Sequence, residues 1–281
     1  MPAIRIRHFT DPGCPWAFSA EPRLRRLEWL YGDALEWETI MVVLSENPED
    51  YADRGFTPEK QAAGMKMLFD RYGMPIDWSE RERMPATADA CRAVVAARLH
   101  APGSERALLR RFRVLAMGGG LLDDPALRRR AAAGAGLDPD ELDGWLADDD
   151  VAQAMDADRA AARSPSPAAL ALDHKLGGPP GERRYTCPSL ELLAGDGVFA
   201  LPGFQPPECY EVVVANLAPS LERRADPASV EEVLAWAGIP LATAEVAGVA
   251  DCAIDEVRAE LSRVAVFDPV GGDGYWSLAG V

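Results

Sequence analysis

The sequence predicts a mixed α/β protein, and three observations carry that prediction. The 281-residue chain opens with a strand, helix and strand pattern, continues with a long helical stretch, and later has two apolar segments around a Gly-containing turn. A strand, helix and strand in succession favour a parallel strand pair, because the helix makes the crossover. The length suits about two packing units at roughly 150 residues each.

The opening unit places a cysteine at the start of a helix. Residues 4–9 alternate branched apolar side chains with Arg and His, which predicts a strand, and Asp-Pro-Gly at 11–13 ends it. Pro15 suits the first turn of a helix running to Tyr31, and residues 35–44 return to strand character. Cys14 is therefore expected at a helix N-terminus.

The middle of the chain is predicted to be all helical from about Thr57 to Arg163. Helices are expected to open at Asp124-Pro125 and Asp138-Pro139, where Asp caps and Pro occupies the first turn. Ser-Pro-Ser-Pro at 164–167 breaks the helical pattern.

After this break, the sequence predicts a hairpin and one more helix. Residues 189–193 and 198–201 flank Ala-Gly-Asp-Gly at 194–197, a hairpin signal. Residues 206–217 have a helical pattern.

The last part of the chain has the element order of a winged helix. Helices are predicted from Asp226-Pro227 to Trp236, over 243–249 and over 254–264, followed by a hairpin at 266–278 that turns at 271–274. We expect this unit to pack against the rest of the protein or a second subunit, with Tyr275 and Trp276 as apolar anchors.

The charge balance argues against a nucleic-acid partner and an anionic membrane surface. Lys and Arg total 29 against 45 Asp and Glu, a formal charge of −16. The winged-helix-like unit, with ten acidic and two basic residues from 226 to 281, would repel phosphates. No apolar run is long enough for a bilayer and residues 1–10 lack a signal-peptide core, so a cytoplasmic protein without membrane partners is expected.

Five scattered cysteines favour reduced thiols over a disulfide or zinc scaffold. Three of them are expected to fill the core, namely Cys91, Cys209 and Cys252. The three histidines share no metal-ligand spacing, so no metal is expected, and His8 is interpreted as structural.

Cys14 differs because of its place at a strand-to-helix junction. Unpaired backbone N–H groups and the helix dipole stabilise a thiolate there and lower the thiol pKa. Asp11 would oppose this effect if it lies near and is ionised.

The residues around Cys14 identify a resemblance. Asp-Pro-Gly-Cys-Pro-Trp-Ala-Phe at 11–18 resembles the DsbA family of thioredoxin-like proteins, in its FrnE-like branch. Thr-Cys-Pro-Ser at 186–189 is similar to the family's cis-proline loop, and residues 201–208 to the start of its last thioredoxin helix. The helical insertion is similar too, at 118–120 and 137–140. The resemblance covers about residues 3–217.

The resemblance implies a thioredoxin-like fold with an all-helical insertion, in addition to the winged-helix-like unit. The expected boundaries are 1–55 with 165–220 for the thioredoxin-like domain, 56–164 for the insertion and 226–281 for the C-terminal unit.

The motif departs from the family at one position. Ala17 stands where the family's oxidoreductases have the second cysteine of Cys-Pro-Trp-Cys, which makes a dithiol cycle within the motif impossible. Kappa-class glutathione transferases and 2-hydroxychromene-2-carboxylate isomerases, also related to this family, have Ser-Pro at the positions of Cys14 and Pro15 and hold a glutathione thiolate there.

The resemblance also implies the site. Cys14 is the expected nucleophile, exposed at the mouth of a cleft that Trp16 is expected to face. Cys187, beside Cys14, is a candidate resolving thiol whose alternative role is to fill the core. The expected substrate-binding residues are Pro15, Trp16, Ala17, Thr186 and Pro188.

Three functions follow as hypotheses. The first is a DsbA-like thiol-disulfide oxidoreductase that works as a monothiol through Cys14. The second is a transferase or isomerase resembling the kappa class, and the third a non-catalytic interaction protein. No bound cofactor is expected. The expected partner is a thiol or disulfide, either glutathione, another low-molecular-weight thiol or a protein; a homo-oligomer stays open.

Overall fold

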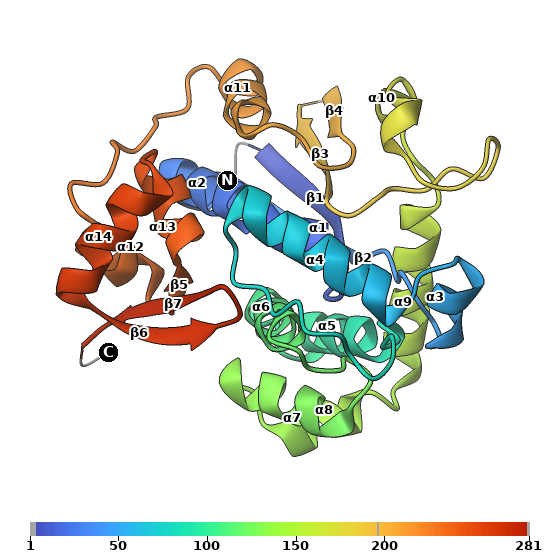
Figure 1. Ribbon diagram of the computed structural model, residues 1–281. Coiled ribbons are helices and arrows are strands. Elements are labelled where there is room, and N and C mark those ends of the chain that lie inside the picture. The colour runs from blue at the N-terminus through green and yellow to red at the C-terminus, as the bar shows by residue number, and fades with distance from the viewer. Residues whose placement is uncertain (1–3, 196, 280–281) are drawn as a thin grey trace.

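The computed structural model describes residues 4–195 and 197–279, in which a mixed sheet lies among helices (Figure 1). The strands follow one another across this sheet in the order β2-β1-β3-β4. They are β1 (Ile4–Thr10), β2 (Leu35–Met41), β3 (Ser189–Ala194) and β4 (Gly197–Leu201). β1 pairs in parallel with β2, and β3 is antiparallel to both β1 and β4. The predicted parallel opening and hairpin are confirmed, while Asp196 of the predicted turn lies outside the described residues.

The helix predicted from Pro15 to Tyr31 is two helices, so this prediction is wrong in its extent. The two are α1 (Pro15–Ser19) and α2 (Glu21–Tyr31), with Ala20 between them. Pro22 explains the break, because it lacks a backbone N–H and occupies the first turn of α2.

A series of helices separates β2 from β3, as predicted. They are α3 (Glu49–Asp53), α4 (Pro58–Tyr72), α5 (Ala88–His100), α6 (Glu105–Met117), α7 (Pro125–Gly134), α8 (Pro139–Trp145), α9 (Asp149–Ala162) and α10 (Pro167–Leu170). The predicted caps are confirmed, since the carboxylates of Asp124 and Asp138 accept from the N–H groups of Ala126 and Asp140. Two short 3-10 turns are also present, η1 (Gly32–Ala34) and η2 (Asp173–Lys175).

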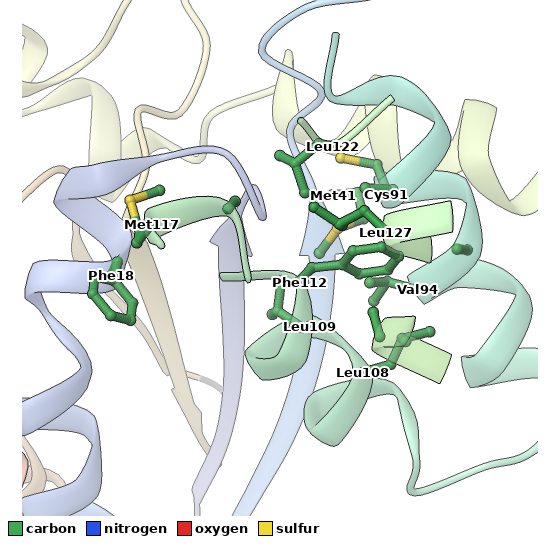
Figure 2. Close-up of a cluster of buried hydrophobic side chains, with 14 of the residues drawn as sticks. Phe18, Met41, Cys91, Val94, Leu108, Leu109, Phe112, Met117, Leu122 and Leu127 are labelled. Carbon is green, nitrogen blue, oxygen red and sulfur yellow. The ribbon is translucent and has the colours of Figure 1, made fainter. Parts of the chain in front are cut away.

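The inserted helices share one apolar core with the sheet and with α1 (Figure 2). Phe18 of α1, Met41 of β2, Cys91 of α5 and Phe112 of α6 are all fully buried in this cluster. Burial of such side chains stabilises the protein by about 1.5–3 kcal/mol each. The helical insertion therefore packs against α1, the helix that Cys14 precedes.

The edge strand β2 is covered by side chains of two inserted helices. Asp158 of α9 accepts from the N–H of Met41 at 2.9 Å, and Arg98 of α5 donates to the carbonyl oxygen of Thr39 and to Asp158. These contacts satisfy backbone groups that an exposed edge would leave open.

The C-terminal part begins after α11 (Pro207–Leu217) and has the predicted order of three helices and a hairpin. Its elements are α12 (Val230–Ala237), β5 (Leu241–Ala242), α13 (Thr243–Ala250), α14 (Ile254–Val264), β6 (Ala265–Val270) and β7 (Asp273–Leu278). α12 begins later than predicted, because the Ser229 hydroxyl, not Asp226, caps it. The two-residue strand β5 was not predicted, and the winged-helix likeness stays a prediction.

This C-terminal unit packs against the rest of the chain, beside α2 (Figure 1). Tyr275 and Trp276, the expected anchors, are both buried. Glu245 of α13 is fully buried and accepts two hydrogen bonds from the Arg110 guanidinium, at 2.7 and 2.6 Å. Among the described residues, no helix has the length and apolar character needed to cross a membrane.

Candidate active site

Cys14 is the residue that precedes α1, as the sequence predicts. Its backbone is extended, with φ −83° and ψ 111°, and its carbonyl oxygen accepts from the N–H of Phe18. Pro15 occupies the first turn of α1. The Cys14 side chain consequently lies beside N–H groups that the helix leaves unpaired.

The structure brings Cys14 and Cys187 together. The Cys14 thiol donates to the carbonyl oxygen of Cys187, with 3.4 Å between the two atoms, and the peptide bond between Cys187 and Pro188 is cis. A hydrogen bond with the Cys187 side chain lowers the pKa of Cys14 below its ordinary value of 9.0, although burial acts in the opposite direction. The Ala17 N–H lowers the pKa of Cys14 as well.

The two thiols of this pair differ in acidity, because their pKa values are shifted in opposite directions. Burial and the hydrogen bond to Cys14 raise the pKa of Cys187 well above its ordinary value. Cys14 therefore loses its proton more readily than Cys187, and the Cys187 thiol stabilises the thiolate of Cys14 once it forms. Thiolates are the nucleophilic form of cysteine, so Cys14 is the better candidate nucleophile of the pair.

Asp11 stabilises the turn between β1 and α1 through hydrogen bonds. It is fully buried and accepts hydrogen bonds from the N–H groups of Gly13 and Leu44, at 2.7 and 2.8 Å. The Thr87 hydroxyl and the Cys91 thiol, both at or near the start of α5, donate to the same carboxylate. Cys91, expected only to fill the core, is thus also a hydrogen-bond donor to the turn.

Asp11 works against the Cys14 thiolate, as the sequence predicts. The negative charge of Asp11 raises the pKa of Cys14, whereas the more distant Arg113 lowers it. Burial raises the pKa of Asp11 itself, which reduces this opposition when the carboxyl is protonated.

An open cleft of about 920 Å³ lies over the two cysteines. Trp16 lines it and packs edge-on against Phe204 and Tyr72, with ring centroids 5.3 and 6.1 Å away. Trp16 is 36% exposed, which confirms the expectation that its ring faces the cleft. The aromatic side chains come from α1, α4 and the loop after β4, so one ligand can touch all three segments.

The sulfur atoms lie at the floor of this cleft. Cys14 is 5% exposed and Cys187 8%, which corrects the expectation of an exposed Cys14 at the cleft mouth. The reason is tertiary, since the residue before the cis-proline bond packs directly against Cys14. Burial raises the pKa of Tyr51 of α3, and the negative charges of Asp11 and Cys14 raise it further.

Of the other predicted substrate-binding residues, only Thr186 lines the cleft. Its hydroxyl donates to the carbonyl oxygen of Lys175 at 2.7 Å. Ala17 is fully buried and contributes its backbone N–H to Cys14. Pro15 and Pro188 are not among the residues that line the cleft.

The remaining predicted cysteine and histidine roles are confirmed only in part. The cysteines of the chain are all free thiols. Cys209 is half-buried, and Cys252 is exposed, so its assignment to the core is wrong; it follows the end of α13, where the chain turns at the surface. His8 is buried, as expected of a structural residue. Across residues 4–195 and 197–279, no cluster of three potential His, Cys, Asp or Glu ligands is arranged for a metal ion.

Three features of the structure can be compared with known families. They are the parallel strand pair joined by helices, the helical insertion, and Cys14 beside a cis-proline loop. The DSBA-like thioredoxin domain family matches residues 5–166, more than half of the chain. The chain belongs to this DsbA-like family. The match includes all but the first residue of β1, Cys14 and the helices from α3 to α9, and it ends before Cys187.

Solved structures share the DsbA-like fold. A probable DsbA oxidoreductase from Streptomyces coelicolor is 20% identical over 80% of this chain and 94% of its own, with a TM-score of 0.54. The cytosolic disulfide reductase DsbM from Pseudomonas aeruginosa is 14% identical over 77% of this chain and 99% of its own, with a TM-score of 0.55. A second DsbM structure, with GSH, is 14% identical over 75% of this chain and 98% of its own, with a TM-score of 0.53. No curated protein sequence matches the chain.

Proposed function

We propose that this protein is a thiol-disulfide oxidoreductase that works through a single nucleophilic cysteine, Cys14. The observation that carries the proposal is the pairing of Cys14 and Cys187 at the floor of an open cleft, where the pKa of the Cys14 thiol is lowered. Membership of the DsbA-like family supports disulfide chemistry. Ala17 removes the second thiol of the usual motif, so the second sulfur has to come from elsewhere.

The first step is attack of the Cys14 thiolate on a disulfide R–S–S–R′. A bond forms between Cys14 and one sulfur, the S–S bond breaks, and R′–S⁻ leaves with the electron pair. The Ala17 N–H and the Cys187 thiol hold the attacking charge on Cys14 before the step. The result is a mixed disulfide on Cys14 and one released thiol.

The second step in this proposal uses an external thiol. A thiolate R″–S⁻ attacks the R sulfur of the mixed disulfide, which releases R–S–S–R″ and restores the Cys14 thiolate. The raised pKa of Cys187 favours this route over resolution by Cys187, because a protonated, buried thiol is a poor nucleophile. DsbM, which shares the fold, has been solved with GSH, and glutathione is the first external thiol to test.

Mass spectrometry of the reduced protein after incubation with glutathione disulfide tests the proposal. A single glutathione adduct on the Cys14 peptide is expected, lost in Cys14→Ser and kept in Cys252→Ser, the matched control at an exposed cysteine. If the product is instead an intramolecular Cys14–Cys187 disulfide, Cys187 and not an external thiol carries out the second step. An unmodified Cys14 would contradict the proposal and favour the binding or scaffold alternatives. Action in the cytoplasm is part of the proposal, as DsbM is described as cytosolic.

A further inference from the structure

The cleft over Cys14 is lined by basic side chains. They come from separate segments, namely Arg23 of α2, Arg71 of α4, His174 and Lys175 of η2, and Arg184 before the cis-proline loop. Within the part of the chain that the structure describes, no Asp or Glu lines this cleft. A basic cleft is unexpected in a protein whose formal charge is −16. The electrostatic potential in the cleft is therefore positive, whereas the net charge of the whole chain is negative.

These cations have no carboxylate partners among the described residues. Most arginines elsewhere form ion pairs, such as Arg110 with Glu245, whereas Arg23, Arg71, Lys175 and Arg184 form none within 4.0 Å. The Lys175 ammonium contacts only a carbonyl oxygen of the loop after β4, at 3.4 Å. Their charge is consequently available to a ligand.

Arg23 is the most confined of these side chains. Its guanidinium carbon lies 4.1 Å from the centroid of the Phe204 ring and 5.4 Å from that of Tyr72. Its Nε–H is buried and has no hydrogen-bond partner among the described residues. Exposed Glu208 is the carboxylate whose charge acts on Arg23, but the two form no ion pair. The guanidinium donates from Nη1 to the carbonyl oxygen of Ser19 at 3.4 Å, and its other Nη donors are available to an acceptor on a ligand.

We propose that this cleft selects small thiols and disulfides that carry carboxylates, and that Arg23 binds one of these carboxylates while the sulfur lies over Cys14. The inference rests on the proposed function and names its substrate class. A volume of about 920 Å³ is within the range of small-molecule sites, which favours a low-molecular-weight ligand over a protein surface. Guanidinium groups bind carboxylates through paired hydrogen bonds. The aromatic side chains beside Arg23 would cover the apolar part of such a ligand.

Exchange rates with three disulfides of different charge test the proposal. The probes are dithiodiglycolate with two carboxylates, hydroxyethyl disulfide without charge, and cystamine with two ammonium groups. The rate of each disulfide with the protein is divided by its rate with a small neutral thiol. Dithiodiglycolate should react with Cys14 about tenfold faster than hydroxyethyl disulfide at low salt, and cystamine more slowly. Added salt should reduce this advantage.

Two charge-removing variants localise the effect. Arg23→Gln should lower the rate ratio of dithiodiglycolate to hydroxyethyl disulfide several-fold. Arg130→Gln removes the same charge from an exposed residue of α7 that has no ion pair among the described residues, and should leave the ratio unchanged. An equal fall in both variants would assign the preference to overall charge and overturn the role of Arg23.

A binding measurement keeps this inference separate from the proposed function. Thiodiglycolate is a thioether that cannot exchange, and calorimetry should give it a dissociation constant about tenfold below that of neutral thiodiethanol. If Cys14 reacts with no disulfide while thiodiglycolate binds preferentially, the proposed function fails and the anion selectivity stands. If the three disulfides react alike and neither thioether is preferred, the selectivity is wrong and the proposed function stands.

Discussion

The carbonyl oxygen of Cys187 lies 3.4 Å from the Sγ atom of Cys14, although 172 residues separate the two in sequence. This contact joins the start of α1 to the cis-proline loop before β3. It brings the two thiols together in surroundings that lower the pKa of Cys14 and raise that of Cys187. Ala17 contributes a backbone N–H to this sulfur.

Replacing Asp11 should separate its structural role from its electrostatic one. Asp11→Asn removes a charge that raises the pKa of Cys14, so the Cys14 pKa should fall, as alkylation rates against pH would show. The protein should also lose about 1–3 kcal/mol of stability, because an amide cannot accept all four hydrogen bonds.

This loss of stability should depend on pH. Burial raises the pKa of Asp11 in the folded state, so its contribution is fully present at low pH and is lost as pH rises through the folded pKa. Denaturant unfolding should therefore give a larger difference between Asp11→Asn and the natural protein at acid pH than at neutral pH. The reverse order would contradict a raised pKa for Asp11.

His8 should make the protein sensitive to acid. Burial and the nearby Arg113 lower the pKa of His8 from 6.5 to about 3, and its Nε2 has no hydrogen-bond partner among the described residues. The unfolded chain takes up a proton below pH 6.5 and the folded protein does so only near 3, so stability is lost as pH falls through this window. The slope from one proton is about 1.4 kcal/mol per pH unit.

Urea unfolding across that pH window measures the His8 contribution. His8→Gln should flatten the fall in stability with decreasing pH. His174→Gln, at an exposed residue, is the matched control and should keep the slope of the natural protein. Equal slopes in the natural protein and His8→Gln would show that His8 does not titrate as this account requires.

Gly248 should be needed for α13 to pack against α2. A Cβ atom at this position would lie 2.8 Å from the Cβ and 3.0 Å from the carbonyl oxygen of Pro22, closer than packed atoms tolerate. Gly248→Ala should destabilise the protein by about 1–3 kcal/mol, measured by denaturant unfolding. Gly144→Ala in α8 is the control, since open space surrounds that Cβ, and it should stabilise the protein by about 1 kcal/mol. Stabilisation by both substitutions would contradict the close contact.

The sequence predicts the parts of this site that depend on local signals. The alternating residues of β1, Pro15 at the helix start and the hairpin arms all follow from short-range patterns, and so does the place of Cys14. The position of the cis-proline loop is predicted only by the family resemblance, because a local pattern does not show which loop lies beside a given helix.

Other features depend on contacts between distant segments. The bond from Cys91 to Asp11 spans 80 residues, and Arg23 meets Phe204 across the cleft from another element. No local pattern distinguishes Cys91 in an Ala-rich helix from an ordinary core residue. The break at Ala20 is different, because Pro22 in the sequence is a signal that could have predicted it.

The pH dependence of Cys14 alkylation tests the central claim most directly. Rates are followed on the Cys14 peptide by mass spectrometry, in the natural protein and in Cys187→Ala, after confirming that both are folded. Half-maximal reactivity of Cys14 should occur below pH 9.0, the ordinary value for a thiol, and should move upward in Cys187→Ala because the hydrogen bond that lowers the pKa is lost. A midpoint at or above pH 9.0 in the natural protein, unchanged by Cys187→Ala, would contradict the assignment of Cys14 as the activated nucleophile.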